Sequence, residues 1–554
     1  MLIALTLIVA FSNAPIKAAD SQNSWTASSP MPTPRGGLGL AVVSGKIYAI
    51  GGLTGDNQLV STNEEYNPIT NQWTSKMPMP TARTGFAIAV YQGKIFVIGG
   101  TVGNNGYVGN NEMYDPATNT WQTKASMPTP RSDLSANIID DRIYLIGGKR
   151  YASVAPFHGE TDINEVYDPS TDTWKTKSPI PTAVIGYGSV VLDKNIYIFG
   201  GSRVSSTSGS ALVVSNNQIY NSQTDAWSMA AALPDPASYG GAITTDGLMA
   251  PVLAYFIGGS ISEQVSSKNQ IFNPANNSWS YGDPMITPRS YLGLAVLNDI
   301  IYAIGGFDGQ AWLSTNEQYT PVGYGRIPPK VQITSPENKT YIETKLVFTV
   351  NRGVDWMGYS LDDQANVTVA SEIVLSNLTD GDHAITLYAN DSLGNMGISS
   401  TIFFATDTKP PIIDVLLPQN RTYDSTDIQL TFSLNEAATN ISYSLDGQEK
   451  ISIIGNVTLP ALSNGSHKVT LYATDETGNS GEKTIYFSIL PFPMLGVTAG
   501  ATIVIIVLAI GYLFFKRKKP TSNKEKTSSK VSNTKIREIK KEIIFNFFSV
   551  ENFN

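Results

Sequence analysis

The chain contains no cysteine and only three histidines among its 554 residues. Because it can form no disulfide bond, its stability must come from buried apolar side chains and from the way its elements close on one another. His158, His383 and His467 fall in three different predicted domains, so they are not expected to converge on one metal ion. We therefore predict no metal site and no cofactor, although an acidic turn such as Asp362-Asp363 also has the composition that calcium accepts.

A basic surface is also missing. The net charge is −8, and segment 516–554 alone contributes +7 from eleven Lys and Arg against four Glu, so the rest of the chain carries −15. An acidic surface of this kind repels nucleic acid, and we expect no nucleic-acid partner.

What the sequence does contain is a sixfold repeat. An aromatic run that ends in Gly-Gly, such as KIYAIGG, occurs six times at intervals of 47 to 58 residues. A Tyr or Phe stands 14 to 20 residues after the first glycine of each pair, and in five of the six copies a Trp follows. A repeat of this length is typical of propellers and solenoids. The first glycines of the six pairs are Gly51, Gly99, Gly147, Gly200, Gly258 and Gly305.

Each copy contains four short strand patterns separated by turn residues, which is the content of one propeller blade. The sixth copy lacks its Trp, whereas Trp25 stands upstream of the first copy. We therefore predict a ring of six blades in which the first strand of the chain pairs with the sixth copy. Such pairing would leave no open sheet edge.

These repeats resemble the kelch repeat over residues 24–322. The resemblance implies a six-bladed kelch-like β-propeller, which we place at residues 20–326. Among the enzymes with such propellers, copper oxidases of the galactose oxidase type need two His ligands and a Cys, which this propeller lacks. The Asp box of sialidases is absent from all six copies. A sugar mutarotase needs only a few acid, base and Arg groups, so this activity stays open.

Two segments after Pro328-Pro329 resemble each other at a spacing of about 84 residues, with GYSLDD in the first and SYSLDG in the second. Short strand patterns with Gly, Asn and Asp turns predict two β-sandwich domains, at residues 327–408 and 409–490. They are similar to the immunoglobulin-like or fibronectin-like stalk modules of prokaryotic surface proteins. His383 and His467 occupy the same place in the two copies, which indicates a local role in a strand.

Residues 494–515 carry no charge and are long enough, as a helix, to cross a bilayer. The sequence KRKK follows at once, which predicts that the tail, residues 516–554, is cytoplasmic and that the preceding residues lie outside. We interpret the apolar residues 1–19 as a secretory signal peptide. The chain is thus predicted to be an all-β protein with a single C-terminal transmembrane helix, located in the cell membrane.

Nine Asn-x-Ser/Thr sequons accompany these export features, and eight of them lie in the predicted sandwiches. This clustering predicts a glycosylated stalk below a nearly bare propeller. With the absence of disulfides, the pattern resembles that of archaeal cell-surface proteins. The candidate acceptors are Asn276, Asn338, Asn366, Asn377, Asn390, Asn420, Asn440, Asn456 and Asn464.

An arginine follows ten residues after the Trp in four copies, and the other two copies have Val184 and Ala237 at this place. The position begins the first strand of a blade, so the arginines would ring one mouth of the channel. In kelch domains that capture acidic peptides, arginines at the corresponding place line the pocket, so the resemblance implies an acidic ligand. The four residues are Arg35, Arg83, Arg131 and Arg289.

A structural interpretation competes with this one. The four copies with Arg have Glu at the start of their third strand, whereas the two copies without Arg have Gln218 and Gln270. The two strands lie about 9.5 Å apart across the strand between them, so two long side chains can meet. The glutamates of these structural pairs would be Glu64, Glu112, Glu165 and Glu317.

The same mouth carries the long loops, whose aromatic side chains stand among Asn, Gly and Ser. Such a composition suits sugar stacking or a protein interface. The aromatic candidates are Tyr107, Tyr151 and Trp312, with Phe157 beside them.

We favour a non-enzymatic cell-surface receptor or adhesin that carries its propeller on a glycosylated stalk and binds an extracellular protein or glycan ligand. One alternative is an exported carbohydrate-active enzyme of the mutarotase type. Another is a structural component of the cell envelope.

Overall fold

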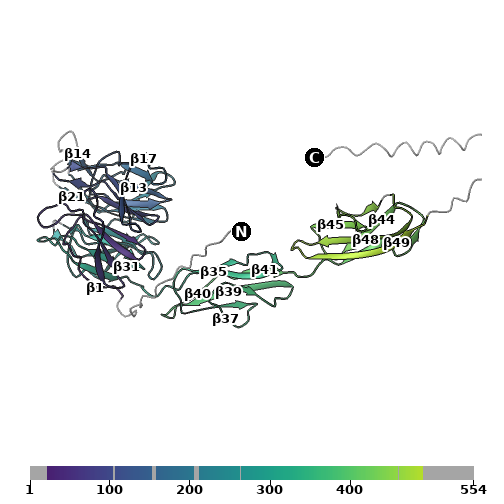
Figure 1. Cartoon of the computed structure of the whole chain (residues 1–554). Helices are drawn as coiled ribbons and strands as arrows, with labels where there is room; N and C mark the ends of the chain where they lie inside the picture. Colours follow the sequence, from purple (N-terminus) through teal and green to yellow (C-terminus); the bar gives the residue numbers. More distant parts are fainter. Residues whose placement is uncertain are drawn as a thin grey trace, which may run out of the picture. The chain divides into compact units, whose positions relative to one another are not determined.

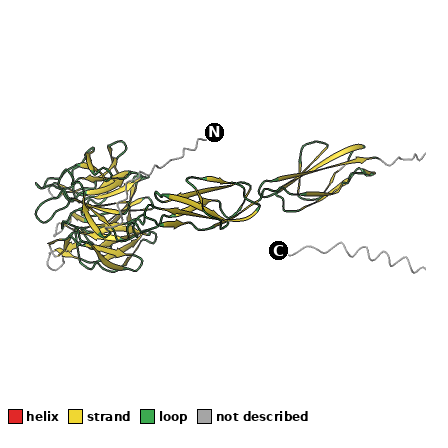
Figure 2. Cartoon of the chain, turned by 90° about the horizontal axis from the view of Figure 1, so that it is seen from below, coloured by secondary structure: helices red, strands yellow, loops and turns green. Residues whose placement is uncertain are grey.

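The computed structural model describes residues 22–103, 106–151, 158–204, 211–261, 264–459 and 461–490. The regular elements in these ranges are all strands (Figures 1 and 2). No helix able to cross a membrane occurs within them. The predicted signal peptide at 1–19, the predicted spanning segment at 494–515 and the basic tail at 516–554 lie outside the described residues.

Six four-stranded antiparallel sheets occupy residues 24–320, one for each copy of the repeat. The inner strand of each sheet contacts the inner strands of both neighbouring sheets, and β2 contacts both β6 and β30, so the sheets form a closed ring.

The first three sheets, each ordered from the ring axis outward, are β2 (Gly39–Val43), β3 (Lys46–Ile50), β4 (Asn63–Asn67) and β5 (Gln72–Ser75); β6 (Ala87–Tyr91), β7 (Lys94–Ile98), β10 (Asn111–Asp115) and β11 (Thr120–Lys124); and β12 (Ala136–Ile139), β13 (Arg142–Ile146), β16 (Asn164–Asp168) and β17 (Thr173–Lys177).

The other three, in the same order, are β18 (Gly188–Leu192), β19 (Asn195–Phe199), β22 (Asn217–Asn221) and β23 (Ala226–Met229); β24 (Gly241–Thr244), β25 (Ala254–Ile257), β28 (Asn269–Asn273) and β29 (Ser278–Gly282); and β30 (Gly293–Leu297), β31 (Ile300–Ile304), β32 (Asn316–Thr320) and β1 (Ser24–Ala27).

Four connections between second and third strands form hairpins of their own. Their strands are β8 (Thr101–Val102) and β9 (Gly106–Tyr107); β14 (Lys149–Tyr151) and β15 (His158–Glu160); β20 (Ser202–Val204) and β21 (Ala211–Val213); and β26 (Ser260–Ile261) and β27 (Gln264–Val265).

The first strand of the chain completes the last sheet. β1 pairs antiparallel with β32, with Trp25 opposite Tyr319, and the two ring centroids are 5.0 Å apart. The Trp25 indole Nε1 donates to the carbonyl oxygen of Asp283 at 2.8 Å. The predicted pairing of the first strand with the sixth copy is confirmed.

The outer tryptophans of the other sheets make the same two contacts. Trp121, for example, lies 5.0 Å from the Tyr114 ring and donates to the carbonyl oxygen of Met77 in the preceding sheet at 2.9 Å. Each outer strand is therefore held to its own sheet and to its neighbour, and β1 makes these contacts from the opposite end of the chain.

Beyond a polar first residue in four of them, the second strands are apolar because both of their faces are buried between sheets. In β3, Tyr48 and Ile50 pack against the second sheet, whereas Ile47 and Ala49 pack against the sixth. The Gly-Gly pair that follows β3 has positive φ angles of 60° and 108°. A Cβ atom at Gly52 would lie 2.7 Å from the carbonyl oxygen of Gly36, so the close approach of these backbones requires glycine.

Two further pairs of sheets follow the ring. In the first pair, β33 (Val331–Ser335), β35 (Thr344–Val350) and β38 (Ile373–Leu375) form one sheet. The facing sheet consists of β34 (Thr340–Tyr341), β41 (Ile402–Thr406), β39 (Gly381–Asn390), β36 (Trp356–Leu361) and β37 (Val367–Thr368), with β40 (Met396–Ile398) beside β39. Leu346, Leu375, Ile385 and Leu387 fill the core between them.

The second pair repeats this arrangement. One sheet contains β42 (Ile413–Leu417), β44 (Ile428–Leu434) and β47 (Val457–Leu459), and the other contains β43 (Thr422–Tyr423), β49 (Ser480–Ile489), β48 (Gly465–Thr474), β45 (Asn440–Leu445) and β46 (Ile451–Ile453). The contacts between residues divide the protein into two compact units, and the boundary lies between Lys409 and Pro410. The second pair of sheets is therefore a unit by itself.

The repeated polar residues of these sheets have local roles. His383 Nδ1 lies 2.8 Å from Asp362 Oδ2, and His467 makes the equivalent contact with Asp446. Burial opposes the charge on His383, but its hydrogen bonds with Asp362 and Thr379 prevail and raise its pKa. Because Asp362 also accepts the Ala384 N–H, the Asp362-Asp363 turn is engaged within its own sheet.

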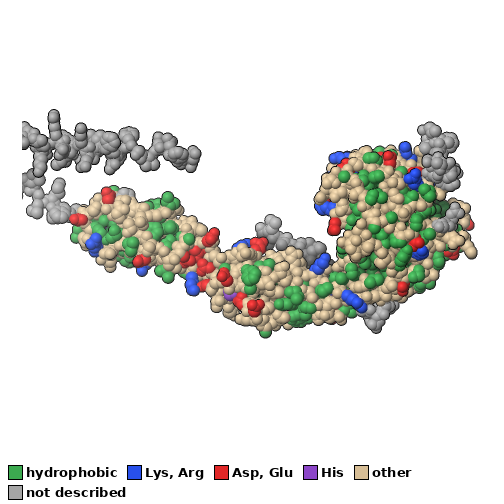
Figure 3. All heavy atoms as spheres, turned by 180° about the vertical axis from the view of Figure 1, so that it is seen from behind, with side chains coloured by type: hydrophobic (Ala, Val, Ile, Leu, Met, Phe, Trp, Pro, Cys, Tyr) green, Lys and Arg blue, Asp and Glu red, His purple; other side chains and the backbone are tan. Residues whose placement is uncertain are grey.

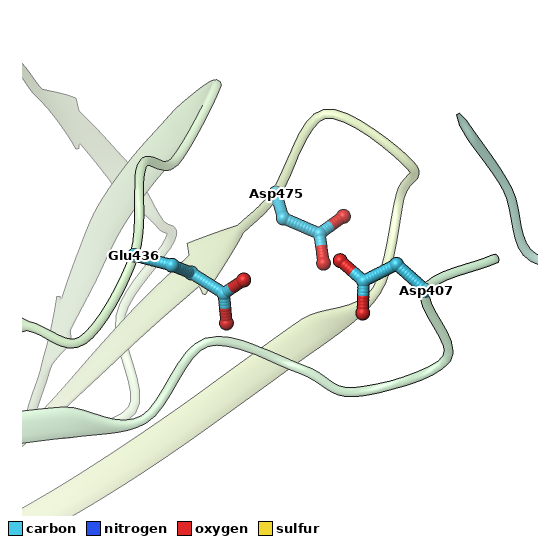
Figure 4. Close-up of side chains that lie close together, drawn as sticks. All are labelled: Asp407, Glu436 and Asp475. Carbon is cyan, nitrogen blue, oxygen red and sulfur yellow. The ribbon is translucent and has the colours of Figure 1, made fainter. Parts of the chain in front are cut away.

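Asp475 closes the turn between β48 and β49, as the close-up in Figure 4 shows. Its Oδ1 accepts the backbone N–H groups of Thr477, Gly478 and Asn479 at 2.7–2.9 Å. The Asp475 carboxylate of the DETGN sequence is therefore part of the turn itself.

Replacing Trp25 with Ala should weaken the propeller more than the same change at Trp121. Both substitutions remove an indole from equivalent contacts, at a cost of about 2 kcal/mol for a half-buried side chain. Only Trp25→Ala also loosens a strand that joins the two ends of the ring. Urea unfolding and limited proteolysis of the full chain would compare the two variants, and equal losses would contradict a special role for closure.

Candidate functional site

The six inner strands surround a channel with a cavity of about 400 Å³. At one end of this channel, the residue three or four positions before each inner strand pairs with the residue that follows a Gly-Gly pair, as Ser132 does with Lys149. The long connections between second and third strands leave the sheets at the same end. We call this end the mouth.

Six backbone hydrogen bonds tie the sheets together at the mouth. Shortly before each inner strand, one residue has a left-handed φ of 55° to 64°. Its N–H donates to the carbonyl oxygen of its counterpart in the preceding sheet at 2.6–3.2 Å, and the bond from Gly37 to Tyr291 closes the circle. The six residues are Gly37, Gly85, Asp133, Gly186, Tyr239 and Tyr291.

Three of these six positions carry a side chain. The Asp133 carboxylate lies over Gly85 and the Tyr239 ring lies over Gly186, because added Cβ atoms there would come within 2.8 Å of Oδ1 and 2.7 Å of the ring. Glycine therefore lets its neighbour's side chain lie across the mouth. Asp133, Tyr239 and Tyr291 themselves hold a backbone conformation that L-residues disfavour, a feature that concentrates at functional sites.

The Asp133 carboxyl group is partly withdrawn from water. Burial raises its pKa, although Lys149 and Ser132 act in the opposite direction. Burial also raises the pKa of Tyr291 to about 12, with a further contribution from the charge of Asp133. The mouth thus places a carboxyl group near phenol hydroxyls that stay neutral and can donate hydrogen bonds.

A run of aromatic rings leads from the mouth to the seam between the sixth and first sheets. The ring centroids of Tyr239 and Tyr291 are 4.5 Å apart, those of Tyr291 and Trp312 are 6.1 Å apart, and those of Trp312 and Phe307 are 5.0 Å apart. These separations correspond to direct aromatic contacts.

A second cavity, of about 570 Å³, opens beside Trp312. We call it the Trp312 cleft. None of the residues that line it is charged: Thr33, Pro34, Thr54, Gly55, Asn57, Phe307, Gln310, Ala311 and Trp312.

The four arginines predicted at the mouth lie inside their own sheets, and none has an exposed side chain. Arg35 Nη1 lies 2.6 Å from Glu64 Oε2, and its Nε and Nη2 donate to the carbonyl oxygens of Gly51 and Ala49. Thr33 donates to the other oxygen of Glu64 at 2.8 Å. The remaining pairs are Arg83 with Glu112, Arg131 with Glu165, and Arg289 with Glu317.

The two sheets without Arg use glutamine in a different way. The Gln218 side chain accepts the Thr182 N–H at 2.8 Å and donates to the Thr182 carbonyl at 3.0 Å. Gln270 makes the same pair of bonds with the backbone of Asp235. Four sheets thus combine Arg with Glu, and two combine Val or Ala with Gln. These are two ways of holding the same segment.

Comparison with known proteins identifies the ring. The family model described as "Attractin/LZTR1 beta-propeller" matches residues 47–314. The N-terminal part of this chain is a Kelch-type β-propeller.

Several proteins are similar to this Kelch-type propeller. Beta-scruin of Limulus polyphemus is 26% identical over 28% of this chain, and Kelch-like protein 25 of Xenopus tropicalis is 31% identical over 26% of it. The matches span 19% and 24% of those relatives, so the chain covers only a minor part of their length. A solved structure described as "Structure of YjhT" aligns with 52% of this chain and 96% of its own, at 16% identity and a TM-score of 0.43.

The ligand-facing interpretation of Arg35, Arg83, Arg131 and Arg289 is corrected by their burial. A guanidinium group with no exposed surface and a carboxylate partner offers nothing to an acidic ligand, and the geometry instead fits the structural pairs. On the face of the propeller in Figure 3, basic and acidic side chains are dispersed among neutral ones.

The aromatic candidates have separate places. Tyr107 in β9 is half-buried, and burial followed by the charge of Asp133 raises its pKa. Tyr151 in β14 is 59% exposed, and Trp312 borders its own cleft. Phe157 lies outside the described residues.

Sequence reasoning missed Asp133, Tyr239 and Tyr291. They stand two residues after the Arg position of their repeats, where the other three copies have Gly. That replacement of glycine by a large or charged residue was the available signal, because the aligned glycines mark a backbone that favours positive φ.

Arg83→Val should destabilise the Kelch-type propeller by about 3–5 kcal/mol, because it leaves Glu112 buried without its partner. The double variant Arg83→Val, Glu112→Gln copies the Val184 and Gln218 combination of the fourth sheet and should recover most of this loss. Chemical unfolding of the full chain would measure both. A double variant no more stable than Arg83→Val would contradict the structural role of the pair.

Proposed function

We propose that this chain is a cell-surface binding protein whose Kelch-type propeller holds an extracellular protein or glycan ligand at its mouth. The two pairs of sheets serve as a stalk, and the C-terminal apolar segment anchors the chain in the membrane.

The chemistry of the mouth is the main support for this proposal. The arginines are neutralised by buried glutamates inside the sheets. Asp133, Tyr239 and Tyr291, in contrast, line the channel cavity. A fixed backbone circle that carries a few polar and aromatic side chains is suited to recognition, because little ordering entropy is lost on binding.

The placement of the sequons supports a glycosylated stalk. Of the nine candidate asparagines, eight are exposed, as an acceptor must be. Asn390 is the exception, since its side-chain oxygen is buried and lacks a hydrogen-bond partner. We therefore remove Asn390 from the proposed acceptors.

A mutarotase-like enzyme is the second candidate, and Asp133 is the observation in its favour. A carboxyl group with a raised pKa beside a tyrosine hydroxyl could move a proton to or from a sugar hemiacetal. This role would make Asp133 the acid or base, with Tyr291 as hydrogen-bond donor.

Tyr291→Ala should weaken ligand binding at the mouth, whereas Tyr281→Ala should leave it unchanged. Tyr281 is a matched control because it is 55% exposed on the outer strand β29. Thermal unfolding of the full chain would be screened against oligosaccharides and peptides, since a ligand at a hundred times its Kd adds about 2.7 kcal/mol. A mouth ligand should lose affinity about 30-fold in Tyr291→Ala.

Equal effects of the two substitutions would place the ligand elsewhere, and a screen without any ligand would count against the binding function. Exchange of sugar anomers by the wild-type chain, lost in Asp133→Asn while the sugar still binds, would instead identify the enzyme.

Protease treatment of intact cells tests location, because an external propeller should be digested while a tail epitope survives.

A further inference from the structure

Resting on the proposed binding function, we propose that the Trp312 cleft is a subsite for a neutral sugar ring, and that the bound oligosaccharide continues along Tyr291 and Tyr239 toward Asp133. This assigns one ligand class, an uncharged glycan, to the mouth.

The lining of the Trp312 cleft carries the chemical argument. Its polar groups are the hydroxyls of Thr33 and Thr54 and the amides of Asn57 and Gln310, with the Trp312 ring beside them. The two amides can donate and accept hydrogen bonds, the two hydroxyls can accept them while their own protons go to Glu64 and Gln58, and an indole offers a broad apolar surface. The absence of a charged residue from the lining favours an uncharged ligand over an acidic or basic peptide.

Both walls of the cleft are fixed turns. On one side, Thr54 accepts the Asn57 N–H at 3.0 Å and donates to the carbonyl oxygen of Gln58. On the other side, Asp308 Oδ1 accepts the N–H groups of Gln310 and Ala311 at 2.8 and 2.7 Å. The backbone on both sides of the cleft is therefore ordered before a ligand binds, which limits the entropy lost on binding.

The Trp312 ring is itself held in place. One part of it lies on Gly36, where an added Cβ atom would be 2.4 Å from Cζ3, and Phe307 pairs with Trp312 across the hairpin. Thr33, on the opposite wall, donates to Glu64, which Arg35 holds. The buried ion pair of the first sheet thus acts as a positioning element for the cleft.

Continuity with the mouth extends the site beyond one sugar ring. Tyr291 contacts Trp312 on one side and Tyr239 on the other, and both tyrosines line the channel cavity with Asp133. The cleft volume of about 570 Å³ also falls within the usual size of ligand sites. An oligosaccharide with one ring at Trp312 would present its next rings to hydroxyl and carboxyl groups.

The test is calorimetric titration of the full chain, purified in a detergent without a sugar head group, with cellohexaose, chitohexaose and mannohexaose. We expect at least one of these neutral oligosaccharides to bind, and Trp312→Ala to weaken it about 30-fold. Trp356→Ala, in β36 of the first sandwich, is the matched control and should bind as the wild type does. Gln310→Glu, an exposed substitution with little effect on folding, should also weaken binding.

Three results would overturn the proposal. These are no binding by any of the three oligosaccharides, binding that Trp312→Ala leaves unchanged, and a Trp312-dependent ligand that is a charged glycan or a peptide. In the first and third cases a ligand sensitive to Tyr291→Ala would still uphold the binding function, so the two proposals fail separately. Unchanged unfolding of Gln310→Glu shows that its loss of binding is local.

Discussion

The pairing of β1 with β32 is the interaction on which the rest of the propeller depends. It brings the segment after β1 beside the end of the sixth sheet, where Met31 N–H donates to Ser314 and Arg35 N–H donates to Leu313. Thr33 and Trp312, which are far apart in the chain, come to line one cleft as a result. The strand pairing that closes the ring therefore also forms the candidate site.

Buried charge separates the scaffold from the site. Each of the four arginines is paired with a buried Glu and donates to at least one backbone carbonyl, so the strong electrostatic groups of the first-strand loops act within the sheets. Val184 with Gln218 shows that a sheet can be held without them. What remains for a ligand is weaker and more directional chemistry, namely hydroxyls, amides, aromatic rings and the Asp133 carboxyl.

Much of the fold could be predicted from the sequence because its signals are repeated. Gly-Gly, Tyr and Trp recur in register, and the displaced Trp25 indicates closure; the correlation of Arg with Glu indicates contact between strands. The mouth could not be predicted in the same way. Whether Arg83 faces the ligand or its own sheet depends on a side-chain rotamer. That Asp133 lies over Gly85 depends on the spacing of sheets formed by residues about 50 positions apart.

Three residues at the mouth depart from the preference for glycine that the other copies of the repeat follow. A left-handed backbone favours glycine, and Gly37, Gly85 and Gly186 follow that preference, but Asp133, Tyr239 and Tyr291 do not. The hydrogen-bonded circle imposes the conformation from both sides, so an unfavourable residue persists at about 1 kcal/mol of strain. Folding alone gives no reason for these three exceptions, since glycine would satisfy the circle at lower cost. Because all six positions of the circle line the channel cavity, the three exceptions give that cavity its carboxyl group and two of its aromatic rings.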